Sequence, residues 1–205
     1  DNLYKDEDSD ASTLLNFTGN HDMGRFAFML QQSKFNYSEN DKIQRSLLAN
    51  ALMFFARGIP VIYYGDEQGF VGDGGNHDSR QDMMASKVAS YNDDDLLANN
   101  KTTAADNFDQ QHMFYQAFAK YAQLYQQHPA LKTGVQKTLY SQKSSGLFIF
   151  TRELAVEGIN QKYIIVVNSD NKEKTLNVNE DKNMEKSKFS LIYQSKAQGN
   201  NLSVD

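Results

Sequence analysis

Residues 58–69 read GIPVIYYGDEQG, and this stretch decides the fold class. The glycine and the proline at its start end a helix and prevent it from resuming. The apolar residues 61–64 then run without interruption, which is typical of a strand buried on both faces in a parallel sheet covered by helices. On such a strand the adjacent Tyr63 and Tyr64 point to opposite sides.

The residues before this stretch predict a helix and, ahead of it, another strand. Apolar residues recur at helical spacing between positions 43 and 55. Ser38 or Asn40 can cap the N-terminus of this helix. Residues 13–18, TLLNFT, form the earlier strand, and GNHD follows at positions 19–22.

The residues after the stretch predict a long loop and a second helix. Residues 66–107 are polar and rich in glycine, and a loop of this length in a compact domain is usually functional or disordered. Residues 108–128 predict a long helix that ends at a proline. One face of this helix is aromatic, which we interpret as core: Phe114, Phe118, Tyr121 and Tyr125. The chain from residue 13 to residue 128 therefore predicts two successive β/α units.

Near residue 134 the pattern changes from helical to strand-like. Residues 138–141 and 147–151 flank a polar turn and predict a hairpin. Residues 163–167 are a continuous apolar run that predicts a central strand. Apolar and polar residues alternate at Leu176 and Val178, and again at Phe189, Leu191 and Tyr193. We therefore predict two domains, an α/β part over residues 1–134 and a small antiparallel β domain over residues 135–205.

Composition excludes several classes of function. The 205 residues carry a net charge of −5, with 40% apolar and 23% charged residues. This acidic balance argues against nucleic acid as a partner, because phosphate binding needs a basic face. There is no cysteine, hence no disulfide framework. No apolar run approaches the roughly 20 residues of a membrane span, so we expect no membrane partner.

The residues that follow the first predicted strand are candidates for chemistry. In a (β/α)₈ barrel, which takes about 250 residues, active-site groups lie at the carboxyl ends of the strands. Asn20, His21 and Asp22 hold such a position. A neutral histidine there can hydrogen-bond sugar hydroxyls while the neighbouring carboxylate meets developing positive charge. The alternative is a plain turn, because Gly-Asn-His-Asp is rich in turn formers.

Two segments together resemble the α-amylase family of glycoside hydrolases. Residues 17–26, FTGNHDMGRF, are similar to the segment after that family's seventh barrel strand, and residues 58–69 resemble its eighth-strand segment. They occur in the family's order, one helix apart. The resemblance covers the chain to about residue 134. It implies the last two β/α units of a (β/α)₈ TIM barrel, followed by a small antiparallel β-sandwich domain.

The resemblance implies a role for four residues. Asp22 matches the third catalytic carboxylate, which stabilises the transition state, and His21 matches a neighbouring substrate-binding residue. Arg25 matches a position near the sugar or its partner carboxylates. Arg80 lies in the loop after the eighth strand, where some members place an arginine against the sugar; a surface ion pair is the alternative. The family's nucleophile Asp and acid/base Glu follow its fourth and fifth strands, which match nothing in this chain, so we expect the isolated chain to be inactive.

Other polar residues receive structural interpretations. Asp66 and Glu67 are expected to shape the barrel rim and not to act in catalysis. The glycine-rich residues 72–75 are a loop and no phosphate site, because the Lys-Ser/Thr of a Walker motif is absent. Asp73 and His77 lack the spacing of metal ligands, so we predict no metal and no cofactor in this chain, while Ca²⁺ is possible in the intact parent protein.

The leading hypothesis is therefore that this chain is part of a retaining, α-glucan-acting hydrolase. Its partners are then an α-glucan or maltooligosaccharide and the remaining, N-terminal part of the same protein. The alternatives are a non-catalytic carbohydrate-binding or scaffold fragment, and an inactive relative with an accessory role in amino-acid transport. Two β/α units also expose strand edges, which predicts self-association. Location is open, with an extracellular or periplasmic site slightly favoured.

Overall fold

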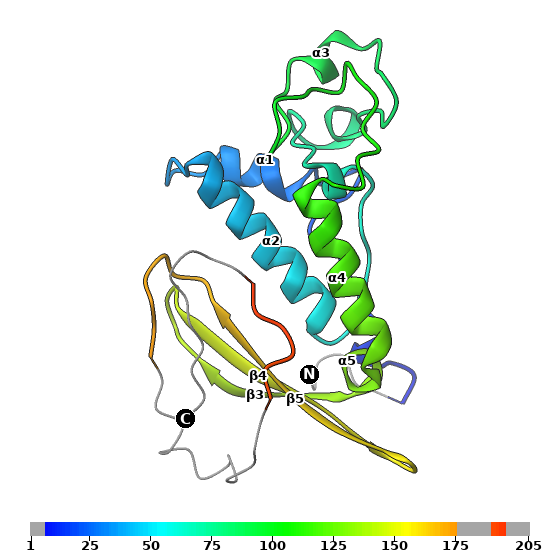
Figure 1. Ribbon diagram of the computed structural model, residues 1–205, viewed down its shortest axis with the longest axis vertical. Helices are drawn as coiled ribbons and strands as arrows, with labels where there is room; N and C mark the ends of the chain where they lie inside the picture. The colour runs from blue at the N-terminus through cyan, green and yellow to red at the C-terminus, as the bar shows by residue number, and fades with distance from the viewer. Residues whose placement is uncertain (1–6, 176–189, 196–205) are drawn as a thin grey trace.

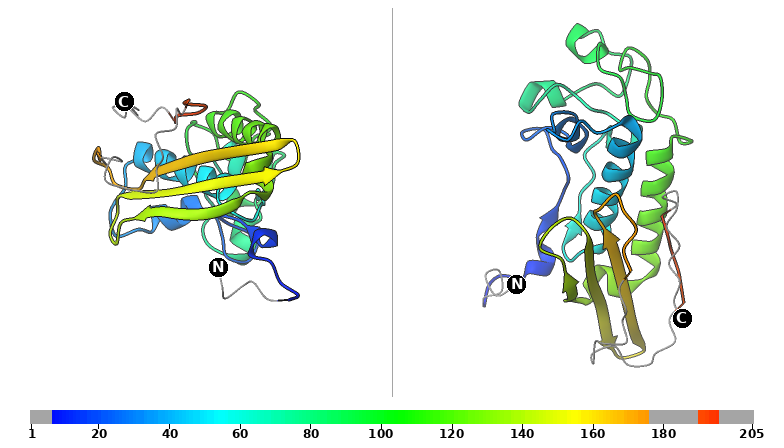
Figure 2. Two further views of the ribbon diagram at one scale, coloured as in Figure 1. Left: turned by 90° about the horizontal axis from the view of Figure 1, so that it is seen from below. Right: turned by 90° about the vertical axis from the view of Figure 1, so that its left-hand side faces the viewer.

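The computed structural model describes residues 7–175 and 190–195. The elements lie along one long axis (Figure 1). A loop-rich region with the short helix α3 (Ala89–Asn92) forms one end, and the long helices α2 (Glu39–Phe55) and α4 (Met113–Gln127) lie side by side in the middle. A three-stranded sheet crosses the other end, as Figure 2 shows from two further sides. None of the helices in the described residues is long and apolar enough to cross a membrane.

Two short parallel strands connect the helical layer to the site described below. The 3₁₀ helix η2 (Ala11–Thr13) leads into β1 (Leu15–Asn16), which pairs in parallel with β2 (Ile59–Pro60). Leu15 lies opposite Ile59, and the Val61 N–H extends the pairing by donating to the Asn16 carbonyl at 2.8 Å. Helices α1 (Phe26–Gln31) and α2 lie between the two strands in the sequence. The chain thus runs from a strand through helices to a second, parallel strand.

The strand predicted over residues 61–64 is wrong in its position and in its burial. Regular pairing ends at Pro60, and the Tyr63 and Tyr64 rings contact each other with centroids 4.8 Å apart instead of pointing to opposite sides. Val61 and Ile62 are 37% and 43% exposed. A parallel strand is buried where further layers cover both faces of its sheet, and within the described residues β2 belongs to a two-stranded sheet with β1 alone.

Helix α2 begins at one of the two caps that the sequence predicted. The Ser38 hydroxyl accepts a hydrogen bond from the Asp41 N–H at 3.2 Å, and the Asp41 carboxylate accepts one from the Ser38 N–H at 3.2 Å. This reciprocal pair is a capping box, and it places Asn40 inside the helix. The helix ends at Phe55, before Gly58, whose φ of +110° lets the chain pass close to the backbone ahead of β1.

Helix α4 begins later than predicted. The sequence predicts a start at residue 108, whereas the helix starts at Met113 because the His112 ring caps it by accepting from the Phe114 N–H at 3.3 Å. Pro129 ends the helix as predicted and opens the short helix α5 (Pro129–Thr133). The predicted aromatic face is confirmed as core, since Phe114, Phe118 and Tyr121 are buried between α4 and α2 and Tyr125 packs against them.

The polar residues 66–107 form a loop region with its own anchor in the core. Two 3₁₀ helices, η3 (Asp66–Gln68) and η4 (Asn76–Ser79), and α3 interrupt it. Four of its apolar side chains are buried: Phe70, Val71, Leu96 and Leu97. This anchoring gives the loop a defined path past the ends of the helices (Figure 1).

The sheet contains β3 (Val135–Ser141), β4 (Leu147–Val156) and β5 (Ile159–Asn168), antiparallel in the order β3-β4-β5. Thr151 in β4 lies opposite Lys137 in β3 and Ile164 in β5. The predicted hairpin is confirmed, and all three strands are longer than predicted. The strand predicted over residues 163–167 is present as β5, but within the described residues it lies at an edge of the sheet and β4 is the central strand. The change from helix to strand falls at Gly134.

The second layer of a β-sandwich is not found among the described residues. Leu176, Val178 and Phe189 lie outside them. Leu191 and Tyr193 lie within them but belong to no strand. The Tyr193 ring instead contacts Tyr121 of α4, with centroids 5.8 Å apart.

Arg152 joins the sheet to the helices. Its guanidinium is fully buried and donates to the carbonyls of Phe55 at 3.0 Å, Lys132 at 3.3 Å and Gly134 at 3.2 Å. Phe55 and Lys132 lie in the last turns of α2 and α5, where carbonyl groups lack partners within the helix. One side chain of β4 therefore caps two helices.

Candidate functional site

The candidate site is built on a tight turn directly after β1. Asn20 and Gly24 exchange two backbone hydrogen bonds, at 3.2 and 3.1 Å. The Asn20 side-chain oxygen also accepts from the N–H groups of Asp22 and Met23, both at 2.8 Å. The turn that the sequence offered as an alternative to function is therefore present, and it places His21 and Asp22 at its exposed tip.

Three of the four predicted site residues come together at this turn. His21 Nε2 lies 3.2 Å from Asp22 Oδ2, and Arg80 Nη2 lies 3.6 Å from Asp22 Oδ1. Arg80 also donates to the His21 carbonyl at 3.3 Å and to the Asn76 side chain at 2.9 Å. The Asp22 side chain is 68% exposed, so its carboxylate is open to a ligand.

Glycines bring the loop that carries Arg80 close to the turn. A Cβ atom on Gly75 would lie 2.7 Å from the Asp22 carbonyl, and one on Gly24, where φ is +88°, would lie 2.5 Å from the Gly74 carbonyl. The Asn76 N–H donates to the Asp22 carbonyl at 3.2 Å. Residues 72–75, which the sequence predicted to be a loop and no phosphate site, thus bring the backbone of the Arg80 loop into close contact with the turn.

Arg25 lies on the inner side of the turn and does not join the other three. Its side chain is fully buried and donates to Asp66 Oδ1 at 2.7 Å and to the Tyr64 carbonyl at 2.8 Å. Its guanidinium carbon also lies 4.5 Å from the centre of the Tyr63 ring. This geometry favours a structural role over the predicted contact with a sugar, because the guanidinium does not face the exposed side.

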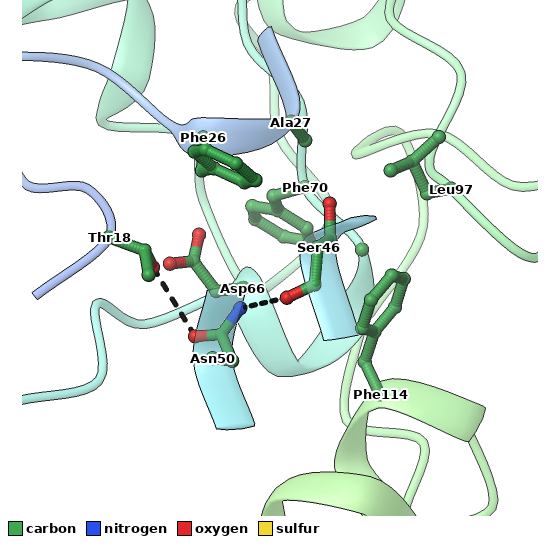
Figure 3. Close-up of a pocket in the computed structure, with 10 residues that line it drawn as sticks. Thr18, Phe26, Ala27, Ser46, Asn50, Asp66, Phe70, Leu97 and Phe114 are labelled. Atoms are coloured by element: carbon green, nitrogen blue, oxygen red, sulfur yellow. Dashed lines mark hydrogen bonds between the residues drawn. The ribbon is translucent and has the colours of Figure 1, made fainter. Parts of the chain in front are cut away.

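Asp66 lines a small pocket, together with Thr18, Ser46 and Asn50 (Figure 3). Burial raises the pKa of Asp66 to about 6, even though the Arg25 guanidinium opposes this shift. Within the described residues, Ser46 Oγ is buried without a hydrogen-bond partner. The pocket is lined by core residues on its other side, so we assign Asp66 to the support of the turn and not to substrate binding.

A cluster of carboxylates lies in the loop region. Oxygen atoms of Asp73, Asp93 and Asp94 all lie within 4.8 Å of one another. Burial and the nearby Asp73 and Asp93 raise the pKa of Asp94 to about 7. Exposed acidic groups of this kind are common without an ion, and the cluster alone does not define a metal site. His77 is not one of its members.

Two residues that contribute to the site were not predicted from the sequence. Asn76 holds Arg80, and Gln81 is a buried partner of Arg25. Asn20, which the sequence placed beside His21 and Asp22, shapes the turn, because asparagine favours turns in which its side chain bonds to the backbone two residues on. Asn76 and Gln81 have no such sequence signal. Gln81 bonds to Arg25, which is 56 positions away in the chain, and the contact of Asn76 with Arg80 follows no recognisable motif.

The parallel strands β1 and β2, joined through the helices α1 and α2, define a β/α protein. Comparison with known proteins gives the family. Residues 3–155 match the family described as alpha amylase, catalytic domain, and the chain belongs to this α-amylase family. The family predicted from the two motifs is confirmed.

Known relatives are much longer than this chain. An alpha-amylase of Streptomyces lividans is 40% identical over 169 residues, which is 82% of this chain and 18% of the relative. A cyclomaltodextrinase of Thermoanaerobacter pseudethanolicus is 28% identical over 178 residues, 87% of this chain and 25% of the relative. The chain thus spans about a fifth to a quarter of the length of these proteins.

Solved structures agree on the fold. A cyclomaltodextrin glucanotransferase with a three-domain ABC distribution matches with a TM-score of 0.53 and 27% identity, over 77% of this chain and 25% of that one. An Anoxybacillus alpha-amylase matches with a TM-score of 0.56 and 23% identity, over 77% and 27% of the two chains.

Proposed function

We propose that this chain is the part of a retaining, α-glucan-acting hydrolase that carries the third catalytic carboxylate, Asp22. The substrates are starch, glycogen or maltooligosaccharides, whose α-glucosidic bonds are cleaved. The observation that carries the proposal is the exposed Asp22 carboxylate at the end of β1, with His21 Nε2 at 3.2 Å and Arg80 Nη2 at 3.6 Å.

The chemistry of the three side chains suits a sugar ring. Glycoside cleavage passes through a transition state that resembles an oxocarbenium ion, and a carboxylate beside it is favoured as positive charge develops. The imidazole of His21 and the guanidinium of Arg80 donate hydrogen bonds to sugar hydroxyls. Both also lie against Asp22, so they orient its carboxylate before a substrate binds.

The chain represents the last two β/α units of a (β/α)₈ barrel, followed by a small C-terminal antiparallel β domain. Retaining hydrolysis needs a nucleophile and an acid/base about 5–5.5 Å apart. In the family these follow earlier barrel strands, so the remaining part of the same protein supplies them and the isolated chain is inactive. The exposed residues Leu15 in β1, Ile59 in β2 and Ile62 just beyond β2 are the surface on which that part docks.

The test replaces Asp22 by asparagine in the full-length protein that contains this chain. Loss of a charge that acts only in the transition state lowers kcat on maltooligosaccharides by about 100-fold or more. The matched control is Glu157→Gln at the exposed turn between β4 and β5, which removes one charge away from the site. If Asp22→Asn keeps kcat within about tenfold of the wild type, the role of Asp22 is wrong.

A second measurement separates this proposal from the carbohydrate-binding alternative. Calorimetric titration of the full-length protein with maltoheptaose, together with a reducing-sugar assay, measures binding and hydrolysis on one sample. If the full-length protein binds the sugar as wild type and as Asp22→Asn, yet neither form hydrolyses it, the binding or scaffold function replaces the catalytic one.

A further inference from the structure

A buried glutamine connects the loop that carries Arg80 with the turn around Asp22. Gln81 is fully buried and follows Arg80 in the chain. Its Oε1 accepts from Arg25 Nε at 2.9 Å, and its Nε2 donates to Asp94 Oδ2 at 3.1 Å. Both ends of the amide are therefore fixed, which holds the side chain in one orientation.

Arg25 gives this glutamine a connection to the turn. Arg25 comes directly after Gly24, the residue that closes the turn around Asp22. The same guanidinium is bound to Asp66 and to the Tyr64 carbonyl just beyond β2. The bond from Arg25 to Gln81 thus fixes the turn and the Arg80 loop to one common point.

Arg80 and Gln81 project to opposite sides of their loop. Gln81 has no exposed surface, whereas the Arg80 side chain is 39% exposed and reaches Asp22. At 3.6 Å, the contact between Arg80 Nη2 and Asp22 Oδ1 is long for a charge-assisted hydrogen bond, so a small shift of the loop breaks it. The position of Arg80 therefore depends on the buried contacts that hold its loop in place.

We propose that Gln81, through its hydrogen bond to Arg25, is a positioning residue that sets Arg80 against Asp22. The inference rests on the proposed function for its catalytic consequence, but the geometric consequence is independent of it. Gln81 touches no substrate in this scheme. It acts by holding the loop in the position from which Arg80 contacts the Asp22 carboxylate.

The test compares two buried glutamines. Gln81→Met keeps the length of the side chain and removes both hydrogen bonds. Gln68→Met is the matched control, because Gln68 is also buried and makes two hydrogen bonds, to the N–H and carbonyl of Asp109 at 2.9 and 3.2 Å. Both substitutions remove a buried amide and two hydrogen bonds. The partners of Gln81 are the side chains of Arg25 and Asp94, whereas those of Gln68 are backbone groups of Asp109 away from the Arg80 loop.

In the full-length protein we expect Gln81→Met to lower kcat by about 10- to 100-fold while KM on maltoheptaose changes less than about threefold, since a small misplacement of catalytic groups has this effect. Gln68→Met should leave kcat within about twofold, as expected when only uniform binding or stability changes. Equal values of kcat for the two variants would overturn the proposal.

A second readout needs no activity. In NMR spectra of the chain itself, Gln81→Met should shift the Arg80 Nε–Hε signal and the Asp22 amide signal, and Gln68→Met should leave both in place. If the full-length wild type fails to hydrolyse α-glucans but these signals move, the proposed function fails and the positioning role stands. If the signals stay in place, the positioning role fails whatever the activity.

Discussion

At the scale of single residues, Asp94 is a group whose protonation state links stability to pH. Its pKa is raised to about 7, first by burial and then by the nearby carboxylates of Asp73 and Asp93. The folded state therefore binds a proton on Asp94 more tightly than the unfolded chain does. The stability from this proton is fully present below the ordinary pKa of an aspartate, and it is lost as the pH rises through about 7.

We expect Asp94→Asn to raise the unfolding temperature relative to the wild type at pH 8, and to have little effect at pH 4. The amide cannot ionise, so the variant avoids the cost of a charge in this cluster. Differential scanning calorimetry at pH 4, 6 and 8 measures the difference. Asp95→Asn, an exposed control in the same loop, should leave the pH dependence unchanged; a constant difference between Asp94→Asn and wild type would contradict the shift.

The residue scale also shows what the sequence could and could not predict about the site. His21 and Asp22 are adjacent, so the sequence places them together, and a family motif supplies their role. The partnership of Arg25 with Gln81 joins residues 56 positions apart through a buried amide. No periodicity or composition reports such a contact. For the same reason the sequence could not show that the Arg25 guanidinium turns inward.

At the scale of elements, local signals were reliable where the partners of an element are local. Ser38 and Asp41 form a capping box within one turn of α2, and the sequence predicted this start. The start of α4 was missed because its cap is a histidine, which lies outside the usual set of capping residues. The strand at 61–64 failed because burial on both faces depends on neighbours that the described residues do not include.

The cap of α2 gives a prediction of its own. Ser38→Ala should lower the free energy of unfolding by about 1 kcal/mol, because it removes the hydroxyl that accepts from the Asp41 N–H. Urea denaturation followed by circular dichroism measures the change. Asn40→Ala tests the other predicted cap and should be neutral or slightly stabilising, since Asn40 lies inside the helix; a larger loss for Asn40→Ala would reverse the assignment.

At the scale of the whole molecule, the two-stranded sheet is the feature that leaves apolar side chains exposed to solvent. Apolar side chains along it are exposed by 37–61%: Leu14, Leu15, Phe17, Ile59, Val61 and Ile62. In a barrel, neighbouring strands and side chains cover such residues. The three-stranded sheet packs against α5, and the side chains along β1 and β2 stay exposed beside it.

We therefore expect the isolated chain to self-associate through β1 and β2, because an open apolar edge offers unpaired N–H and carbonyl groups to a second chain. Sedimentation velocity over a range of concentrations measures the association. The double variant Leu15→Lys with Ile59→Lys places two charges at paired positions on this edge and should shift the chain towards the monomer. Val156→Lys, at the distant end of β4 with a similarly exposed valine, should leave the association unchanged. A wild-type chain that stays monomeric at all concentrations, with the helical content of the structure, would show that packing within the chain is enough to protect the edge.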